Sequence, residues 1–279
     1  MLVGCGTVTF RTYPLEEALE RVKRAGFEYV EPQATPPFCP HIDVDDDDPK
    51  AFRELVKSYG FKGATALWCT HGAIIPDDKS VEYGKKCLRW ARAADIPVVN
   101  IGDGFAPEGM SEAEAWELLR SRLLEILKVA EECQVYLAIE PHGTFSLTSE
   151  GLKRILSISD SEWLCINYDT ANIHRAAYVE SRGDEFEWKM ASEAEDEVEV
   201  LRQIVDRVRH VHVKDIKGNE CVALGQGDVN IVGCLQVLKE SGYEGVLSLE
   251  TEGDFDAEEG QKLIVESHRY LTRVLAEIL

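Results

Sequence analysis

Hydrophobic and polar positions along the 279-residue chain alternate between short apolar runs and longer amphipathic stretches. Eight apolar runs have the length and near-continuous hydrophobic character of strands that are buried on both faces. They cover residues 2–10, 27–32, 61–69, 97–103, 135–141, 163–169, 208–215 and 245–251. Strands that are separated by helical stretches pair in parallel through right-handed crossovers. The pattern therefore predicts eight β/α units.

The stretches between these runs carry helix start and stop signals. The first stretch opens at Pro14 and closes at Gly26, which is the usual placement of these two residue types around a helix. Ser111 and Glu114 have the spacing of a capping box. The residues that follow carry an apolar stripe of period 3.6, formed by Leu119, Leu123, Ile126, Leu127 and Ala130.

One segment departs from the alternation of strands and helices. The segment 178–199 is long and acidic, and we expect it to form an extended loop after the sixth strand that runs into a helix. Eight β/α units in a chain of this length fit a closed barrel of roughly 250 residues. The sequence therefore predicts an α/β fold with one domain over residues 1–279, a single (β/α)8 TIM barrel.

Polar residues stand at the C-terminal ends of most predicted strands, where barrels of this kind carry their reactive groups. These strand-end residues are Glu31, Gln33, Trp68, His71, Asp103, Glu140, His142, Asp169, His212, Lys214 and Glu250. Buried carboxylates at several strand ends would repel one another unless a cation neutralised them. The pattern therefore indicates a cation site.

Strand parity sharpens this prediction. Side chains alternate between the two faces of a strand, so Glu140 and His142 point the same way, as do His212 and Lys214. A single Glu at a strand end often serves only as a helix cap or an ion-pair partner. Carboxylates and a histidine at the ends of four consecutive strands favour a metal-binding site. The predicted ligands are Glu140, Asp169, His212 and Glu250. Oxygen-rich donor sets suit Mn²⁺, our first expectation, or Mg²⁺ and Co²⁺, and Zn²⁺ stays open.

Three other histidines have simpler explanations. His210 shares a face with His212 but lies deeper in the barrel, so we expect a hydrogen-bonded core histidine. We expect His41 and His268 on the surface.

Composition and charge narrow the class of protein. A net charge of −21 opposes binding to nucleic acids and to anionic membranes. No apolar run reaches the ~18 residues of a membrane span, and the N-terminus lacks the pattern of a secretory signal. The eight cysteines form no CxxC pair, which is typical of reduced thiols in a cytoplasmic protein.

Several motifs, distributed over nearly the whole chain, resemble those of a known protein family. They are Glu31, LAIEPHG at 137–143, INYDTANIH at 166–174, HVHVKD at 210–215, and the glycine-rich loop, helix and strand at 223–251. With these motifs the chain resembles the xylose-isomerase-like barrel superfamily, which includes sugar-phosphate isomerases and epimerases, ketose 3-epimerases, inosose isomerases and dehydratases, and the apurinic endonuclease. The resemblance implies the same four metal ligands as the strand ends.

Two departures from the family pattern bear on the substrate. The third position after Asp169 is often His in the family and is Asn172 here, with a His at 174 instead. Ketose 3-epimerases often continue past the fifth-strand Glu with an Asn-Arg-Phe-Glu-like segment, whereas this chain has PHGTFSLTS. The second departure weakens an assignment to free-ketose epimerases, and the charge of −21 opposes a DNA substrate.

The resemblance implies an isomerase or epimerase that acts on a sugar, keto-sugar or cyclitol through an enediolate. Glu140 and Glu250 would exchange the proton, with His142 as a shuttle or as the base. A metal-dependent lyase or dehydratase on a keto-sugar or 3-keto-glycoside, including C-glycoside cleavage, is the alternative. A third hypothesis is that the protein is a non-catalytic sugar-binding or partner subunit.

The remaining expectations concern substrate contacts and assembly. The residues expected to contact a small carbohydrate are Glu31, Trp68, His71, Asn172, His174 and Lys214. Barrels of this kind often pair through surface helices and the long sixth loop, so we expect a homo-oligomer with Trp188 as a candidate anchor.

Overall fold

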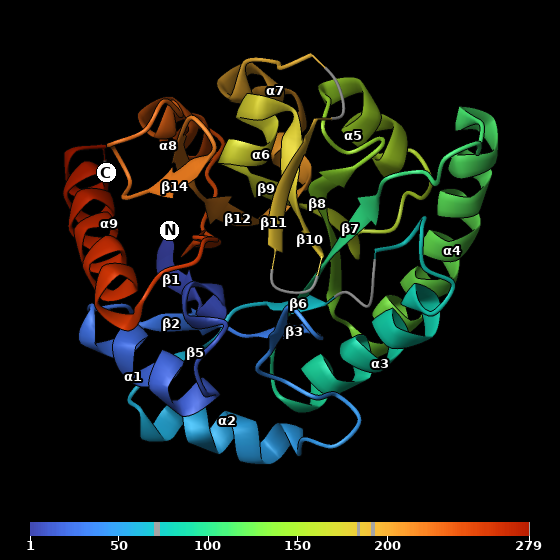
Figure 1. Ribbon diagram of the computed structural model, residues 1–279. Helices are drawn as coiled ribbons and strands as arrows, with labels where there is room; N and C mark the ends of the chain where they lie inside the picture. Colours follow the sequence, from blue (N-terminus) through green and yellow to red (C-terminus); the bar gives the residue numbers. More distant parts are fainter. Residues whose placement is uncertain (70–72, 183–184, 191–192, 279) are drawn as a thin grey trace.

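In the computed structural model, a ring of parallel strands surrounds the centre of the molecule and helices form the outer layer (Figure 1). The structure describes residues 1–69, 73–182, 185–190 and 193–278. The predicted α/β class and the (β/α)8 barrel are confirmed.

The barrel strands follow one another around the ring in chain order. They are β1 (Leu2–Gly6), β2 (Tyr29–Glu31) with β3 (Gln33–Thr35), β5 (Gly63–Ala64) with β6 (Leu67–Cys69), β7 (Val98–Gly104), β8 (Tyr136–Gly143), β9 (Leu164–Asp169), β12 (Val208–Val213) and β15 (Val246–Leu249). The second and third barrel strands are each split in two. Because β2 pairs with β5 and β3 pairs with β6, the ring closes between them.

Hydrogen bonds bridge both breaks. Pro32 separates β2 from β3 and has no N–H to donate. Its carbonyl still accepts from Trp68 N at 3.2 Å, and Thr65 N donates to Val30 O at 3.0 Å. The two halves of each split strand therefore both belong to the barrel sheet.

The helices pack outside the ring and cover its apolar outer face (Figure 1). They are α1 (Leu15–Arg24), α2 (Pro49–Ser58), α3 (Ser80–Ala93), α4 (Glu112–Cys133), α5 (Ser149–Leu156), α6 (Thr170–Arg175), α7 (Glu197–Ile204), α8 (Ile231–Glu240) and α9 (Ala257–Ile278), with single 3-10 turns η1 (Thr7–Phe10) and η2 (Val205–Arg207). The capping box of α4 is confirmed, because Ser111 Oγ accepts from Glu114 N and the Glu114 carboxylate accepts from Ser111 N. The apolar stripe of this helix is buried.

The expected loop at 178–199 is wrong over its first part. A two-stranded antiparallel hairpin stands there, formed by β10 (Ala177–Arg182) and β11 (Glu185–Met190), and it lies against β8. Aromatic and charged residues alternate in EFEWKM with the period of a strand, and this signal outweighs the acidic composition. The helix expected next is α7. The side chain of Trp188 lies outside the described residues.

Two further short pairings add to the barrel. β4 (Cys39–Pro40) pairs with β3, and β13 (Asp215–Lys217) forms a hairpin with β14 (Glu220–Val222) after the seventh barrel strand. All eight cysteines are free thiols. Within the described residues, no helix combines the length and the apolar character that crossing a membrane requires.

The surface prediction for His41 is also wrong. Its ring is buried, with Nδ1 at 2.8 Å from Thr7 Oγ1 and Nε2 at 3.0 Å from Tyr13 O. The acidic run at residues 43–48 is typical of a surface segment, but the contact partners of His41 come from η1 and the segment after it. His268 is half-buried, and its ring meets Phe27 edge-on at 4.7 Å between centroids.

Asp215 organises the glycine-rich loop before α8. Its buried carboxylate accepts hydrogen bonds from Gly225 N at 2.8 Å, Gly227 N at 3.0 Å and Val229 N at 3.2 Å. A Cβ on Gly227 would lie 2.1 Å from Asp215 Oδ1, so the loop can approach this closely only with glycine there.

We predict that Asp215→Ala lowers the free energy of unfolding by about 3 kcal/mol, because three backbone N–H groups of the loop, one of them buried, lose their acceptor. Asp228→Ala is the matched control, since Asp228 lies in the same loop with an exposed side chain. Urea denaturation measures both. Equal, small losses in the two variants would contradict the role assigned to Asp215.

Candidate metal centre at the mouth of the barrel

Four side chains converge at the mouth of the barrel, the end at which the parallel strands terminate. Glu140 lies on β8, Asp169 ends β9, His212 lies on β12, and Glu250 directly follows β15. Each offers one ligand atom, and these four atoms all lie within 4.8 Å of one another. All four residues are buried. The structure thus brings the four predicted ligands into one cluster.

Local backbone geometry aims these groups at a common point. His212 and Asp169 are direct register partners on neighbouring strands. Asp169 is also the N-cap of α6, where its Oδ1 accepts from Ala171 N at 2.8 Å and Asn172 N at 2.7 Å. With Oδ1 engaged by the helix, Oδ2 is the oxygen left for the cluster.

The two nitrogens of His212 face different partners. Nδ1 lies 3.4 Å from Glu140 Oε1 and 3.4 Å from Glu250 Oε2. Nε2 lies 2.9 Å and 3.0 Å from the two oxygens of Glu31, which also accepts from Asn100 Nδ2 at 2.8 Å. A ligating histidine commonly gives its second N–H to a carboxylate, which fixes the ring and its tautomer. Glu31, expected as a substrate contact, is thus placed beside His212 and buried.

His210 is the hydrogen-bonded core histidine that its position predicted. It is fully buried, and its Nδ1 lies 2.9 Å from Asn167 Oδ1. Asn167 Nδ2 in turn approaches Glu140 Oε2 at 3.3 Å. This layer supports the cluster from below.

A lysine lies within the carboxylate group. Lys214 Nζ is 2.9 Å from Asp169 Oδ2, 2.7 Å from Glu250 Oε2 and 2.8 Å from Glu252 Oε2. Sequence analysis did not predict Glu252 as a site residue, although it follows Glu250 by two residues and alternation would place both side chains on the same face. Continuing the alternation past the predicted strand end would have found it.

Three other predicted residues surround Glu140. His142 Nδ1 lies 4.0 Å from Glu140 Oε1, and its ring meets Trp68 edge-on at 5.4 Å between centroids. Asn172 Nδ2 lies 3.4 Å from Glu140 Oε1 and donates to Pro141 O at 3.0 Å. Trp68, His142 and Asn172 therefore form one side of the site.

The loop after β8 is held by a buried carboxylate from the neighbouring strand. Asp103 accepts from Phe145 N at 2.7 Å and from Ser146 Oγ at 2.5 Å, and Ser146 Oγ accepts from His142 N at 2.7 Å. Burial raises the pKa of Asp103 to about 6. The strand-end Asp103 thus supports the backbone that carries His142.

His174, one of the predicted substrate contacts, lies against α7. His174 Nδ1 lies 3.0 Å from Glu197 Oε2, and Glu197 Oε1 accepts from Asn230 N at 2.6 Å. These bonds tie α6 and α7 to the segment before α8, so His174 is part of the framework here. His71 lies outside the described residues.

The cluster sets strong electrostatic constraints. Burial and the nearby Glu250 raise the pKa of Glu140 to about 8, although His212 acts in the opposite direction. Burial also acts to raise the pKa of Glu250, but His212 and Lys214 together hold it well below its usual range. Burial and Lys214 lower the pKa of His142 to about 3, so this ring is neutral near pH 7.

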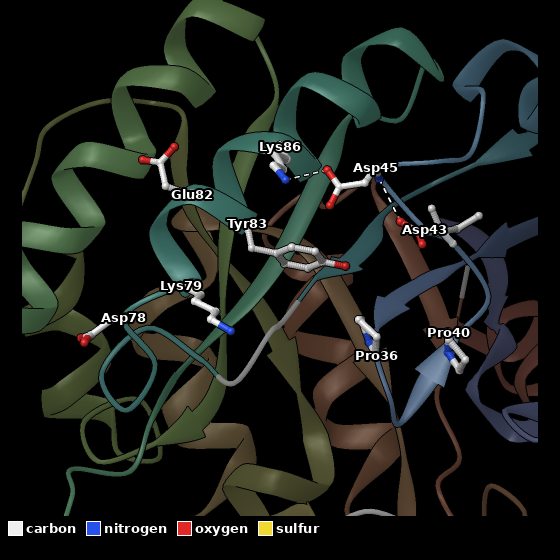
Figure 2. A pocket seen from close by; sticks show the side chains of 10 residues that line it. Pro36, Pro40, Asp43, Asp45, Asp78, Lys79, Glu82, Tyr83 and Lys86 are labelled. Carbon is white, nitrogen blue, oxygen red and sulfur yellow. Dashed lines mark hydrogen bonds and ion pairs between the residues drawn. The ribbon is translucent and has the colours of Figure 1, made fainter.

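A separate pocket of about 530 Å³ lies between the segment that follows β3 and the first turns of α3 (Figure 2). Its lining includes Pro36 and Tyr83, and Lys86 Nζ lies 2.6 Å from Asp45 Oδ1 on its rim. None of its lining residues belongs to the metal cluster.

Fold and site together define an α/β barrel with an oxygen-rich candidate metal centre where its parallel strands end. The chain belongs to the xylose isomerase-like TIM barrel family, whose model matches residues 19–274.

Curated relatives match part of their own length. An uncharacterized protein of Methanocaldococcus jannaschii is 29% identical over 206 residues, which is 71% of this chain and 65% of that protein. An inosose dehydratase of Clostridium tetani is 25% identical over 170 residues, which is 54% of this chain and 51% of that protein. The matched regions thus span between half and two thirds of these relatives.

Solved structures match the whole chain in fold. A D-tagatose 3-epimerase-like protein has a TM-score of 0.79 at 21% identity, covering 100% of this chain and 98% of that one. The IOLI protein with a bound zinc atom has a TM-score of 0.77 at 16% identity, covering 100% and 99%. At these identities the likeness establishes the shared fold.

We predict that Glu31 controls metal affinity through His212. Glu31→Leu removes the acceptor of His212 Nε2 and should weaken Mn²⁺ binding by roughly 10–100-fold. Glu31→Gln keeps an acceptor without the charge, so its loss should be smaller. Isothermal titration of the purified proteins gives both affinities. Unchanged binding in Glu31→Leu would show that His212 needs no such support.

Proposed function

We propose that this protein is a divalent-metal-dependent isomerase or epimerase that acts on a sugar, keto-sugar or cyclitol through an enediolate. The observation that carries the proposal is the buried cluster of three carboxylates and one imidazole at the barrel mouth. The family membership and the likeness to an epimerase-like protein support the same class of reaction.

The donor atoms fit a divalent metal held by Glu140, Asp169, His212 and Glu250. Asp169 Oδ2 and Glu250 Oε2 are buried oxygens that already face a cation, because Lys214 Nζ lies 2.9 Å from the first and 2.7 Å from the second. Such oxygens are suited to a cation. Carboxylates with one imidazole favour Mn²⁺ in our proposal, and the zinc atom of the IOLI protein keeps Zn²⁺ in consideration. When bound, the metal would polarise a substrate carbonyl and stabilise developing negative charge.

The proton transfers would be carried out by the chain's own carboxylates. Glu140 on β8 and Glu250 after β15 are separated around the ring by β9 and β12. They can therefore flank a substrate from two sides, so that one removes the proton and the other returns it. Positioned general acid or base catalysis of this kind typically contributes ~10²–10⁴-fold.

The side chains around Glu140 would bind and orient the substrate. Trp68 offers an apolar ring face, and Asn172 and Lys214 offer donors toward hydroxyl or carbonyl oxygens. His142 lies 4.0 Å from Glu140, so it can relay a proton between Glu140 and a substrate oxygen. For His174 and His71 a substrate contact stays a prediction without structural support.

A lyase or dehydratase on a keto-sugar or 3-keto-glycoside is the second candidate. Here the same enediolate would expel a leaving group, and His142 would relay to that group the proton that Glu140 removed from carbon. The position of His142 beside Glu140 favours this candidate, and so does the match to an inosose dehydratase. Isomerisation conserves mass, whereas elimination releases water or an aglycone.

A non-catalytic sugar-binding role would leave the metal cluster without a use, so we rank it last. A homo-oligomer and a cytoplasmic location both stay predictions. Light scattering at working concentration tests the first, and a monomer there would contradict it.

We predict that the Mn²⁺-loaded protein, incubated in D₂O with a panel of keto-sugars and inososes, gives a product of conserved composition with deuterium at the carbon next to the carbonyl. Glu250→Gln keeps an oxygen ligand and removes the basic carboxylate, so turnover should fall by ~10²–10⁴-fold. Glu244→Gln, an exposed site, is the control and should match the wild type. Loss of water or an aglycone would select the lyase. Neither deuterium incorporation nor elimination with any substrate would refute the enediolate.

A further inference from the structure

Lys214 contacts the same carboxylate oxygens that a divalent metal would need. We propose that Lys214 is a built-in counter-cation that competes with the metal for Asp169 and Glu250, and that Glu252 weakens this competition by giving Lys214 a second anionic partner. The proposal rests on the proposed metal dependence and concerns two residues outside the ligand set.

The burial of Lys214 leaves it few alternatives. Its side chain is 1% exposed, so the ammonium cannot turn into solvent and must be neutralised locally. The backbone fixes its position further, because Thr170 Oγ1 donates to Lys214 O at 2.8 Å and accepts from Lys214 N at 3.0 Å. Lys214 therefore stays near the carboxylates whatever else binds there.

The contacts of the ammonium fall into two kinds. Lys214 Nζ donates hydrogen bonds to Glu252 Oε2 at 2.8 Å and Asn172 Oδ1 at 3.4 Å. Toward Asp169 Oδ2 and Glu250 Oε2 it is within ion-pair distance without the alignment of a hydrogen bond. Lys214 Nζ thus shares its charge between Glu252, outside the predicted ligand set, and the two predicted ligand oxygens.

Repulsion between the Lys214 ammonium and the metal ion makes the position of the ammonium important for metal affinity. Two cations near the same oxygens repel each other, and in a buried site this repulsion is screened far less than at the surface. Without Glu252, the only anionic partners of the ammonium at short range among the described residues would be the predicted ligand carboxylates. With Glu252, Lys214 has an anion that the predicted ligand set does not use. Glu252 is therefore a positioning residue that acts through Lys214.

The test is a double-mutant cycle on the full-length protein, with Mn²⁺ affinity measured by isothermal titration. Lys214→Met removes the competitor and should tighten Mn²⁺ binding by at least ~10-fold. Glu252→Gln removes the second anion and should weaken binding by a similar factor. In the double variant, the effect of Glu252→Gln should shrink to less than ~3-fold, because its route through Lys214 is gone.

Lys62→Met is the matched control, since it removes the same charge from an exposed ion pair with Glu28 and should leave the affinity unchanged. Should Lys214→Met fold poorly, Lys214→Gln takes its place, and the rise in Tm on adding Mn²⁺ must still exceed that of the wild type. Equal or weaker binding without Lys214, or an undiminished Glu252→Gln effect in the double variant, would overturn the proposal. Wild-type protein that binds no Mn²⁺ or Zn²⁺ would instead overturn the proposed metal dependence on which it rests.

Discussion

The concentration of buried negative charge at the mouth of the barrel constrains the rest of the site. Parallel strands end at one rim, so the carboxylates of Glu140, Asp169 and Glu250 must approach one another. Burying unpaired charges is costly, and like charges at short range add to the cost. His212 and Lys214 offset part of it from within the cluster. A divalent cation would complete the balance and turn a destabilising arrangement into a Lewis acid site.

Polar residues around the cluster fix its geometry rather than perform chemistry. Asp169 Oδ1 caps α6, Glu31 holds His212, and Asp103 holds the loop whose Ser146 accepts from His142 N. Asp215 does the same for the loop before α8. Such supporting contacts keep the ligand oxygens aimed at one point, which a metal site requires. The Lys214–Glu252 pair extends this layer to the rim.

Much of this arrangement could be predicted from residue patterns, because period-two alternation in a barrel strand decides which side chains face the centre. Parity placed Glu140, His212 and Glu250 on the same side, and the structure brings them together. Parity cannot tell how far a side chain reaches, so the contact between Glu31 and His212 was not predicted. Glu252 was missed because the predicted strand stopped one residue short of it.

Other errors came from long-range contacts that composition does not encode. The burial of His41 depends on η1 and on Tyr13, far away in the chain, and an acidic neighbourhood gives no hint of it. The hairpin β10–β11 was hidden by its charge, although its alternation was visible. The differences between prediction and structure lie mainly in the loops. There the contacts of a segment depend on the surrounding barrel more than on local sequence propensity.

The central claim is that the four converging residues hold one divalent metal ion. Elemental analysis of protein purified without chelators tests it most directly, when wild type is compared with the doubly substituted Asp169→Ala, His212→Ala protein. The account predicts about one divalent ion per wild-type chain, and loss of that ion from the double variant while the far-ultraviolet circular dichroism spectrum is retained. A double variant that keeps a stoichiometric ion, or a folded wild-type protein that neither contains nor takes up one, would contradict it.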